Sequence, residues 1–217
     1  MKPIASGNSL EPHPDTPAKD VPAVSCSWVW RSATEWAFDF IVGVPPAKLA
    51  LPAPGEPGRT DRLSDHTRFA LYLMDPETGS RCEFEFSPSG QWTADAVDAG
   101  GEGGGELTLQ RPARVLSTEP GQLALAMRAE LHALGLDEDA IRQLDEAAQP
   151  LEEPRQFALS AVMDNPAPND GRCWLAGLSA VIEEVDGTRS YWALAHPAGC
   201  PDLRHPDCFV LELPPAS

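Results

Sequence analysis

The chain has few basic side chains. Its 16 Lys and Arg stand against 33 Asp and Glu, which gives a formal net charge of −17 at pH 7. No cluster of Lys and Arg offsets this charge locally. Because a field of this sign repels polyanions, we expect neither nucleic acid nor an anionic membrane as a partner.

Long apolar runs and paired cysteines are also missing. No run of about 18 apolar residues could span a membrane, and residues 1–22 lack the basic-then-apolar order of a secretion signal. The five cysteines form an odd, scattered set. Such a set is typical of free thiols in a reducing compartment and not of a disulfide framework. The sequence therefore predicts a cytoplasmic protein.

The composition changes along the chain. Residues 1–22 contain five prolines and no periodic apolar pattern, which predicts a disordered, Pro-rich tail. Residues 23–217 are of a length that fits a single domain. Within them, the segment from about 132 to 153 carries helix signals: Asp137 as N-cap, acids in the first turn, an apolar stripe and Pro150 at the end. We expect this segment to be a helical insertion.

Alternation of apolar and polar residues dominates elsewhere. Over residues 81–86, Cys82, Phe84 and Phe86 alternate with one arginine and two glutamates, the pattern of a half-buried strand. Residues 174–183 are apolar on both faces, as in the middle of a sheet. Roughly ten such short segments, separated by turns, predict an all-β fold. The expected architecture is an antiparallel β-sandwich, jelly-roll or immunoglobulin-like, with one inserted α-helix.

Most of the coordinating and hydrogen-bonding chemistry lies near the C-terminus, on a Pro/Gly-rich connection between two apolar segments. Trp192 leads by alternation into this connection, and Trp92 directly follows a turn. Indoles offer apolar faces to a ring-shaped ligand such as a sugar, and neighbouring polar groups can bind its hydroxyls. We expect a non-enzymatic site for a small ligand, most simply a carbohydrate, at one end of the sandwich. Its expected residues are His66, Trp92, Trp192, His196, Asp202 and His205.

Two other classes of site remain open. His196, Cys200, His205 and Cys208 have the donor atoms of a zinc site, although their spacing lacks the short paired knuckles of such sites. His66, Asp202 and His205 could instead serve a hydrolytic enzyme as acids and bases. The chain contains no nucleophile elbow and no His-Glu-x-x-His helix, which favours a binding protein over an enzyme. We predict no resident cofactor, with haem, zinc and calcium left open, and make no prediction of oligomeric state.

Four segments carry a resemblance to a known family. They are HTRFALYL (66–73), EFEFSPSGQWTADAVD (83–98), LSAVIEEVDGTRSYWALAHP (178–197) and PDCFVLEL (206–213). In these segments the chain resembles the bacterial DOMON-like domain proteins, which are related to family 9 carbohydrate-binding modules. The resemblance covers most of residues 24–214 in order. It implies a β-sandwich of a superfamily whose members bind sugars or haem.

The chain departs from this family in three places. The family usually has Cys where Arg68 stands and an acidic residue where Ala70 stands, which weakens any role carried over to that strand. Its usual Gly-Lys-Pro-Asp-Phe-His run appears here as residues 199–204, with Cys200 in place of Lys. The segment from about 132 to 153 is an insertion relative to shorter relatives, so nothing is carried over to it.

Overall fold

A computed structural model gives the fold and describes residues 5–32, 35–61, 63, 66–101, 103–109, 112–117, 156–164 and 173–213. The expected helical insertion over residues 132–153 lies outside the described residues.

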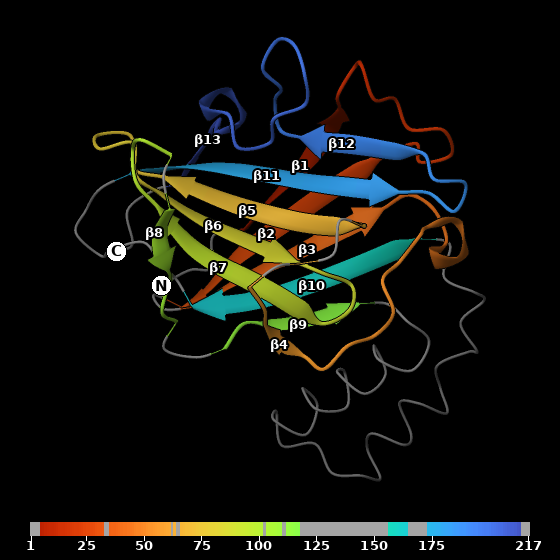
Figure 1. Ribbon diagram of the computed structural model, residues 1–217, viewed down its shortest axis with the longest axis horizontal. Coiled ribbons are helices and arrows are strands. Elements are labelled where there is room, and N and C mark those ends of the chain that lie inside the picture. The colour runs from red at the N-terminus through yellow and green to blue at the C-terminus, as the bar shows by residue number, and fades with distance from the viewer. Residues whose placement is uncertain are drawn as a thin grey trace, which may run out of the picture.

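The described residues form thirteen strands and two short 3₁₀ turns (Figure 1). The first half contains β1 (Ala5–Pro12), β2 (Val24–Ser32), β3 (Glu35–Val42), η1 (Pro46–Lys48), β4 (Gly58–Arg59), β5 (Arg68–Met74), β6 (Arg81–Phe86) and β7 (Gln91–Val97). The second half contains β8 (Gly103–Glu106), β9 (Arg114–Ser117), β10 (Phe157–Asp164), β11 (Trp174–Glu183), β12 (Arg189–Ala193), η2 (Pro206–Cys208) and β13 (Leu211–Leu213).

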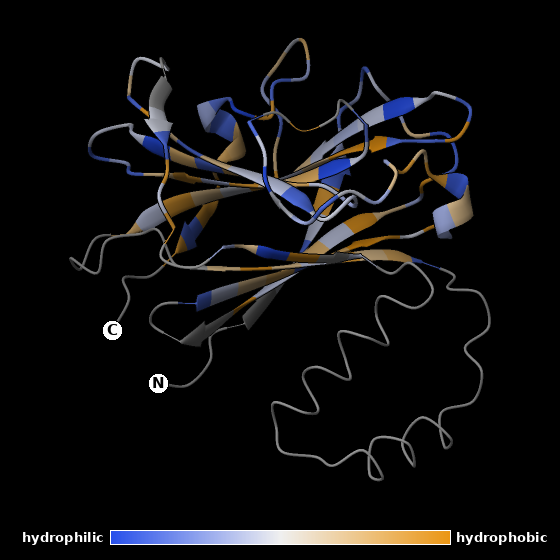
Figure 2. Cartoon of the chain, turned by 60° about the horizontal axis from the view of Figure 1, so that its bottom comes forward, coloured by the Kyte–Doolittle hydropathy of each residue, from blue (hydrophilic) through white to orange (hydrophobic). Residues whose placement is uncertain are grey.

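The strands make one mixed, nearly closed sheet. Its order is β4-β7-β6-β5-β11-β12-β1-β2-β3-β10-β9, with β13 beside β11 and β8 beside β7. The short β4–β7 pair is parallel, whereas the other strand pairs are antiparallel. Figure 1 shows β5, β6, β7 and β11 in front of β2, β3 and β10, and Figure 2 shows the same two halves one above the other. The prediction of an all-β, mainly antiparallel fold is confirmed. The two halves are joined into one sheet by β1.

The N-terminal segment differs from the tail that its prolines predict. Ala5 to Leu10 pair with β2, and Glu11 and Pro12 pair with β12, so β1 links the two halves. Leu10 is buried in the core. Among the described residues, the prolines of this segment lie at or after the end of β1, where they do not interrupt its ladder of hydrogen bonds. Composition therefore misled the prediction, because the described prolines lie at or after the end of the strand and not in its middle.

The core lies between the two halves of the sheet. Its largest fully buried side chains include Phe40, Phe69, Phe84, Phe86 and Phe157. The Phe69 ring centroid lies 5.0 Å from that of Phe40 and 6.0 Å from that of Phe157. Because β3 and β10 lie in one half and β5 in the other, these ring contacts join the halves. In the described part of the chain, no helix is long and apolar enough to cross a membrane.

Candidate functional site

The outer face of β5 and β6 is covered by a loop, although alternation predicts that it meets water. The inward positions of β6 hold phenylalanines, so Arg81, Glu83 and Glu85 point outward beside Tyr72 of β5. Residues 196–210, the covering loop, fold back over this face. A second apolar cluster forms there, separate from the main core: Ala70, Tyr72, Ala193, Cys208 and Phe209, with Met74, Leu175 and Leu203 against it.

The covering loop approaches β11 closely at one position. A Cβ on Gly177 would lie 3.1 Å from the carbonyl oxygen of Cys208, so only glycine lets the loop lie this near the strand. The loop also carries its own hydrogen bonds. Asp202 accepts from the backbone N–H of Arg204 at 3.0 Å, and Nδ1 of His205 accepts from the N–H of Asp207 at 3.2 Å, at the start of η2. These bonds give the loop a defined shape.

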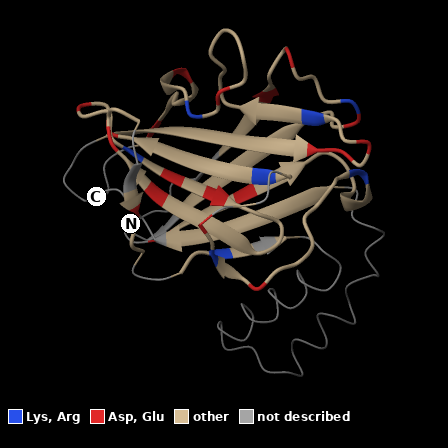
Figure 3. Ribbon diagram, viewed as in Figure 1, with Lys and Arg blue, Asp and Glu red and all other residues tan. Residues whose placement is uncertain are grey.

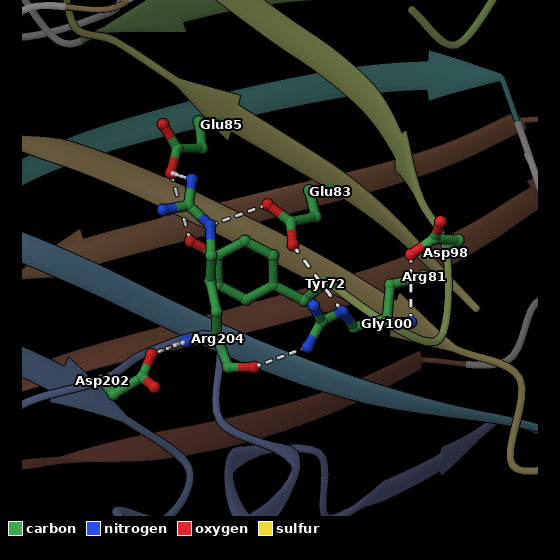
Figure 4. A network of polar contacts seen from close by, with 8 residues as sticks. All are labelled: Tyr72, Arg81, Glu83, Glu85, Asp98, Gly100, Asp202 and Arg204. Carbon is green, nitrogen blue, oxygen red and sulfur yellow. Dashed lines mark hydrogen bonds and ion pairs between the residues drawn. The ribbon is translucent and has the colours of Figure 1, made fainter. Parts of the chain in front are cut away.

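A network of charged groups ties the loop to the sheet (Figure 4). Arg204 donates from Nε to Glu83 at 2.7 Å and from Nη2 to Glu85 at 2.9 Å. Its guanidinium lies 5.9 Å from the centre of the Tyr72 ring, and the Tyr72 hydroxyl donates to Glu85 at 3.2 Å. Arg81 donates to the backbone carbonyl of Arg204 at 3.0 Å and lies 3.8 Å from Glu83. One loop arginine thus bridges two outward carboxylates of β6.

The network is largely screened from solvent. The side chains of Glu83 and Glu85 are 9% and 12% exposed, whereas that of Arg204 is 52% exposed. Burial raises the pKa of Tyr72 well above its usual value, and the Glu85 carboxylate acts in the same direction. Burial opposes the charged form of Arg204, but the negative groups around it prevail and raise its pKa. Tyr72 therefore stays a neutral donor, and Arg204 stays a cation.

A second polar group lies on the same outer face, at the other end of β11. Nδ1 of His66 donates to Glu183 at 2.9 Å, and Arg189 donates to the same carboxylate oxygen at 3.0 Å. The hydrogen bond from His66, opposed by burial and reinforced by Arg189, lowers the pKa of Glu183. Six residues of β11 separate Glu183 from Gly177, which pairs with Tyr72. At about 3.4 Å per residue the two polar groups are about 20 Å apart.

Arg68 lies between these two groups. It pairs with Val181 in the register of β5 and β11, and its Nε is 3.9 Å from Glu85. Figure 3 shows the same arrangement of charge, with acidic residues on β6 and β7 and a basic residue on β5. The outer face therefore carries a row of charged groups that runs along β5 from His66 to Arg204.

The two tryptophans expected at the site are not brought together. Trp92 lies on β7 and Trp192 on β12, with β6, β5 and β11 between them. Four strand spacings of about 4.8 Å put their backbones about 19 Å apart. Alternation turns both side chains inward, where they are 5% and 2% exposed, and Trp192 donates from Nε1 to the Ser190 hydroxyl at 2.9 Å. In this structure both indoles are part of the core and offer no face to a ligand.

The expected polar residues divide between two places. His196, Asp202 and His205 belong to the covering loop, and Nε2 of His196 donates to the carbonyl of Glu11 at 2.8 Å. His66 lies at the opposite end of the outer face, beside Glu183. Because about 20 Å separates these ends, His66 does not form an acid–base group with Asp202 and His205.

The four possible zinc ligands have different environments. Cys208 is buried and donates from Sγ to the carbonyl of Asp202 at 3.4 Å, whereas Cys200 is exposed. His196 contacts the N-terminal segment, where its ring centroid lies 5.0 Å from that of His13. Over the described ranges of the chain, no three His, Cys, Asp or Glu side chains are grouped so that they could hold a metal ion.

Sequence reasoning missed the Arg204 network. Alternation predicted that Glu83 and Glu85 point away from the core, but nothing local indicated that a loop covers them. Arg204 is 121 residues from Glu83 and 119 from Glu85 in the chain. The available signal was the concentration of charge on outward positions of β5 and β6.

Comparison with solved structures finds a protein of similar fold. A crystal structure from Bacteroides uniformis ATCC 8492, described as a "putative carbohydrate-binding protein", matches this fold with a TM-score of 0.57 and 14% sequence identity. The match covers 96% of this chain and 85% of the other. No protein-family model matches the chain, and comparison with curated proteins finds no match. At this identity the likeness establishes a shared fold.

Proposed function

We propose that this protein is a non-enzymatic carbohydrate-binding protein, with a β-sandwich of the DOMON-like type related to family 9 carbohydrate-binding modules. Its sugar site is the outer face of β5, β6 and β11 beside the covering loop. The likeness in fold to the Bacteroides protein supports the class of ligand. The row of charged side chains on the outer face supports the position of the site.

The observation that carries the proposal is the fixed array of guanidinium and carboxylate groups on this face. Sugars present neighbouring hydroxyls that both donate and accept hydrogen bonds. Planar guanidinium and carboxylate groups can bind two such hydroxyls at once, and charge-assisted bonds are stronger than neutral ones. The carboxylates stand on β6, and the hydrogen bonds to them hold Arg204 of the covering loop and Tyr72 of β5 in place, so little order has to be gained on binding.

Residues expected from the sequence flank this face. Asp202 and His205 stand on the covering loop, and the His205 side chain is 42% exposed. The side chain of His66 is 51% exposed at the far end of the row. They would contact a ligand long enough to extend beyond Arg204 or Arg68. Trp92 and Trp192 support the strands from the core side and do not touch the ligand.

A thermal-shift screen over mono- and oligosaccharides, haem and divalent ions tests the function. A ligand present at about 100 times its dissociation constant adds about 2.7 kcal/mol to stability. We expect a sugar to raise the melting temperature. Stabilisation by haem or a metal ion, with no response to sugars, would contradict the proposal.

Calorimetric titration of the responding sugar then tests the site. Arg204→Lys keeps the charge and removes the planar fork, so we expect at least tenfold weaker binding. Lys48→Ala is the matched control, because Lys48 forms an exposed ion pair with Asp20 at 3.3 Å away from this face. Equal affinities for Arg204→Lys and the wild type would show that the sugar binds elsewhere.

A further inference from the structure

We propose that the outer face prefers carbohydrates that carry a carboxylate, such as uronic acids, and that Arg68 binds this carboxylate. The inference rests on the proposed function and names the class of sugar. It follows from the position of Arg68, from its incomplete pairing and from the match between a guanidinium and a carboxylate.

The position of Arg68 suits contact with a ligand. It lies at the start of β5, between the His66 group and the Arg204 network. Its side chain is 24% exposed. The side chain is therefore largely covered while part of it remains accessible, which limits the entropy lost on binding.

The pairing of Arg68 is incomplete. Within the described part of the chain, its one ionic partner is Glu85, and the contact from Nε is 3.9 Å long. That length exceeds a hydrogen bond. Glu85 makes its shorter contacts elsewhere, with Arg204 at 2.9 Å and with the Tyr72 hydroxyl at 3.2 Å. The Arg68 guanidinium thus retains donors that a ligand can use.

The neighbouring charges are better paired than Arg68. The guanidiniums of Arg81 and Arg204 contact the carboxylates of Glu83 and Glu85, and Asp202 accepts from the backbone N–H of Arg204.

Two acids beyond the network also have cations as partners. Asp95, opposite Glu83 in the sheet, pairs with Arg59 at 3.2 Å, and Glu183 pairs with His66 and Arg189. Among the described cations of this face, Arg68 therefore has the longest ionic contact, at 3.9 Å, and a ligand carboxylate would give it a closer partner.

The guanidinium of Arg68 and the carboxylate of an acidic sugar are chemically complementary. A guanidinium presents parallel N–H donors in a rigid fork, and a carboxylate accepts both, which gives two charge-assisted hydrogen bonds. A neutral sugar can offer Arg68 only hydroxyl oxygens. The difference between the two classes of sugar should therefore depend on Arg68 more than on any other residue of the face.

The test compares glucuronate and galacturonate oligomers with the corresponding glucose and galactose oligomers by calorimetric titration. We expect the acidic sugars to bind at least tenfold more tightly to the wild type. Arg68→Gln should abolish this preference and change the affinity for neutral sugars less than threefold. Arg68→Lys should keep part of the preference, and this preference should fall as salt is raised.

Lys48→Gln is the matched control, since it changes the net charge by the same amount at an exposed position. The melting temperature of each variant shows that it is folded. Neutral sugars that bind as tightly as acidic ones, or a preference that survives in Arg68→Gln, would overturn this inference and leave the proposed function standing. Binding of neither class would overturn the proposed function itself.

Discussion

Replacing Arg204 by Met tests whether the charged network holds the covering loop on the sheet. The substitution keeps much of the side-chain length and removes the charge. It leaves the carboxylates of Glu83 and Glu85, 9% and 12% exposed, without the cation that lies 2.7 and 2.9 Å from them. Breaking one partner of a fully buried ion pair costs about 3–5 kcal/mol. Since the Arg204 side chain is 52% exposed, we expect a smaller loss, about 2–3 kcal/mol.

Such a loss is large against the total stability of an ordinary domain, about 5–15 kcal/mol. The cost should arise from the stranded carboxylates and not from lost packing. In a background with Glu83→Gln and Glu85→Gln, Arg204→Met should therefore cost less than about 1 kcal/mol, because the substitution then strands no carboxylate. The difference between the two backgrounds measures the coupling directly.

Urea unfolding of the four proteins gives these free energies, and hydrogen exchange of residues 196–210 reports on the loop. We expect faster exchange across the loop in Arg204→Met, because its anchor to β6 is gone. Lys48→Met serves as the control, with an expected change below about 1 kcal/mol for an exposed ion pair. A loss below about 0.5 kcal/mol for Arg204→Met, or equal losses in both backgrounds, would refute the reasoning.

Two further substitutions and one labelling experiment probe the fold around the site. Gly177→Ala should lower the melting temperature and speed hydrogen exchange in the covering loop, because its Cβ would meet the Cys208 carbonyl at 3.1 Å; unchanged exchange would show that the loop can shift. Trp192→Ala should cost about 3–5 kcal/mol in urea unfolding, as expected for a large buried side chain, and a small loss would place the indole outside the core. Native protein should show two rapidly reacting thiols at pH 8 with a disulfide reagent, Cys173 and Cys200, and five after unfolding. Burial raises the pKa of the Cys208 and Cys82 thiols to about 11, so these thiols should react slowly at pH 8. Their ionisation should destabilise the fold only as pH rises from about 9 through 11. Five rapidly reacting thiols in the native state would contradict the burial.

Local patterns predicted much of the sheet because apolar and polar residues alternate within each strand. The apolar positions of β6 follow from burial against the other half of the sheet. Strand β11 is apolar on both faces because the covering loop lies against its outer face. Alternation of apolar residues over residues 26–42 also predicts Trp28 and Trp36 as core residues, and both are buried. Such predictions succeed where a residue's environment depends mainly on its own strand.

The N-terminal strand was missed because its pairing depends on distant partners. Residues 5–12 include Gly7, Asn8 and two serines, which have no strand signal of their own. Their hydrogen bonds come from β2 and from β12, which lies about 180 residues later in the chain. Composition indicates what a segment prefers in isolation. Strand β1 is instead held by hydrogen bonds to the edges of β2 and β12.

The candidate site was misplaced for a related reason. Aromatic side chains have two uses, in cores and in binding sites, and the sequence does not separate them. In this protein alternation turns Trp92 and Trp192 inward. The residues brought together on the outer face are instead Glu83, Glu85 and Arg204, and a loop from the far end of the chain completes them.

This arrangement has a consequence for how a ligand would be recognised. With the two indoles inside the core, a ligand on the outer face meets mainly charged groups, and Tyr72 is itself covered by Phe209 and Arg204. Affinity would then come from directed, charge-assisted hydrogen bonds more than from stacking. Binding of that kind weakens as salt is added, because screening acts on exposed charges such as those of Arg204 and Arg68. A sugar that binds with the same affinity from low to high ionic strength would therefore point to an apolar site elsewhere in the protein.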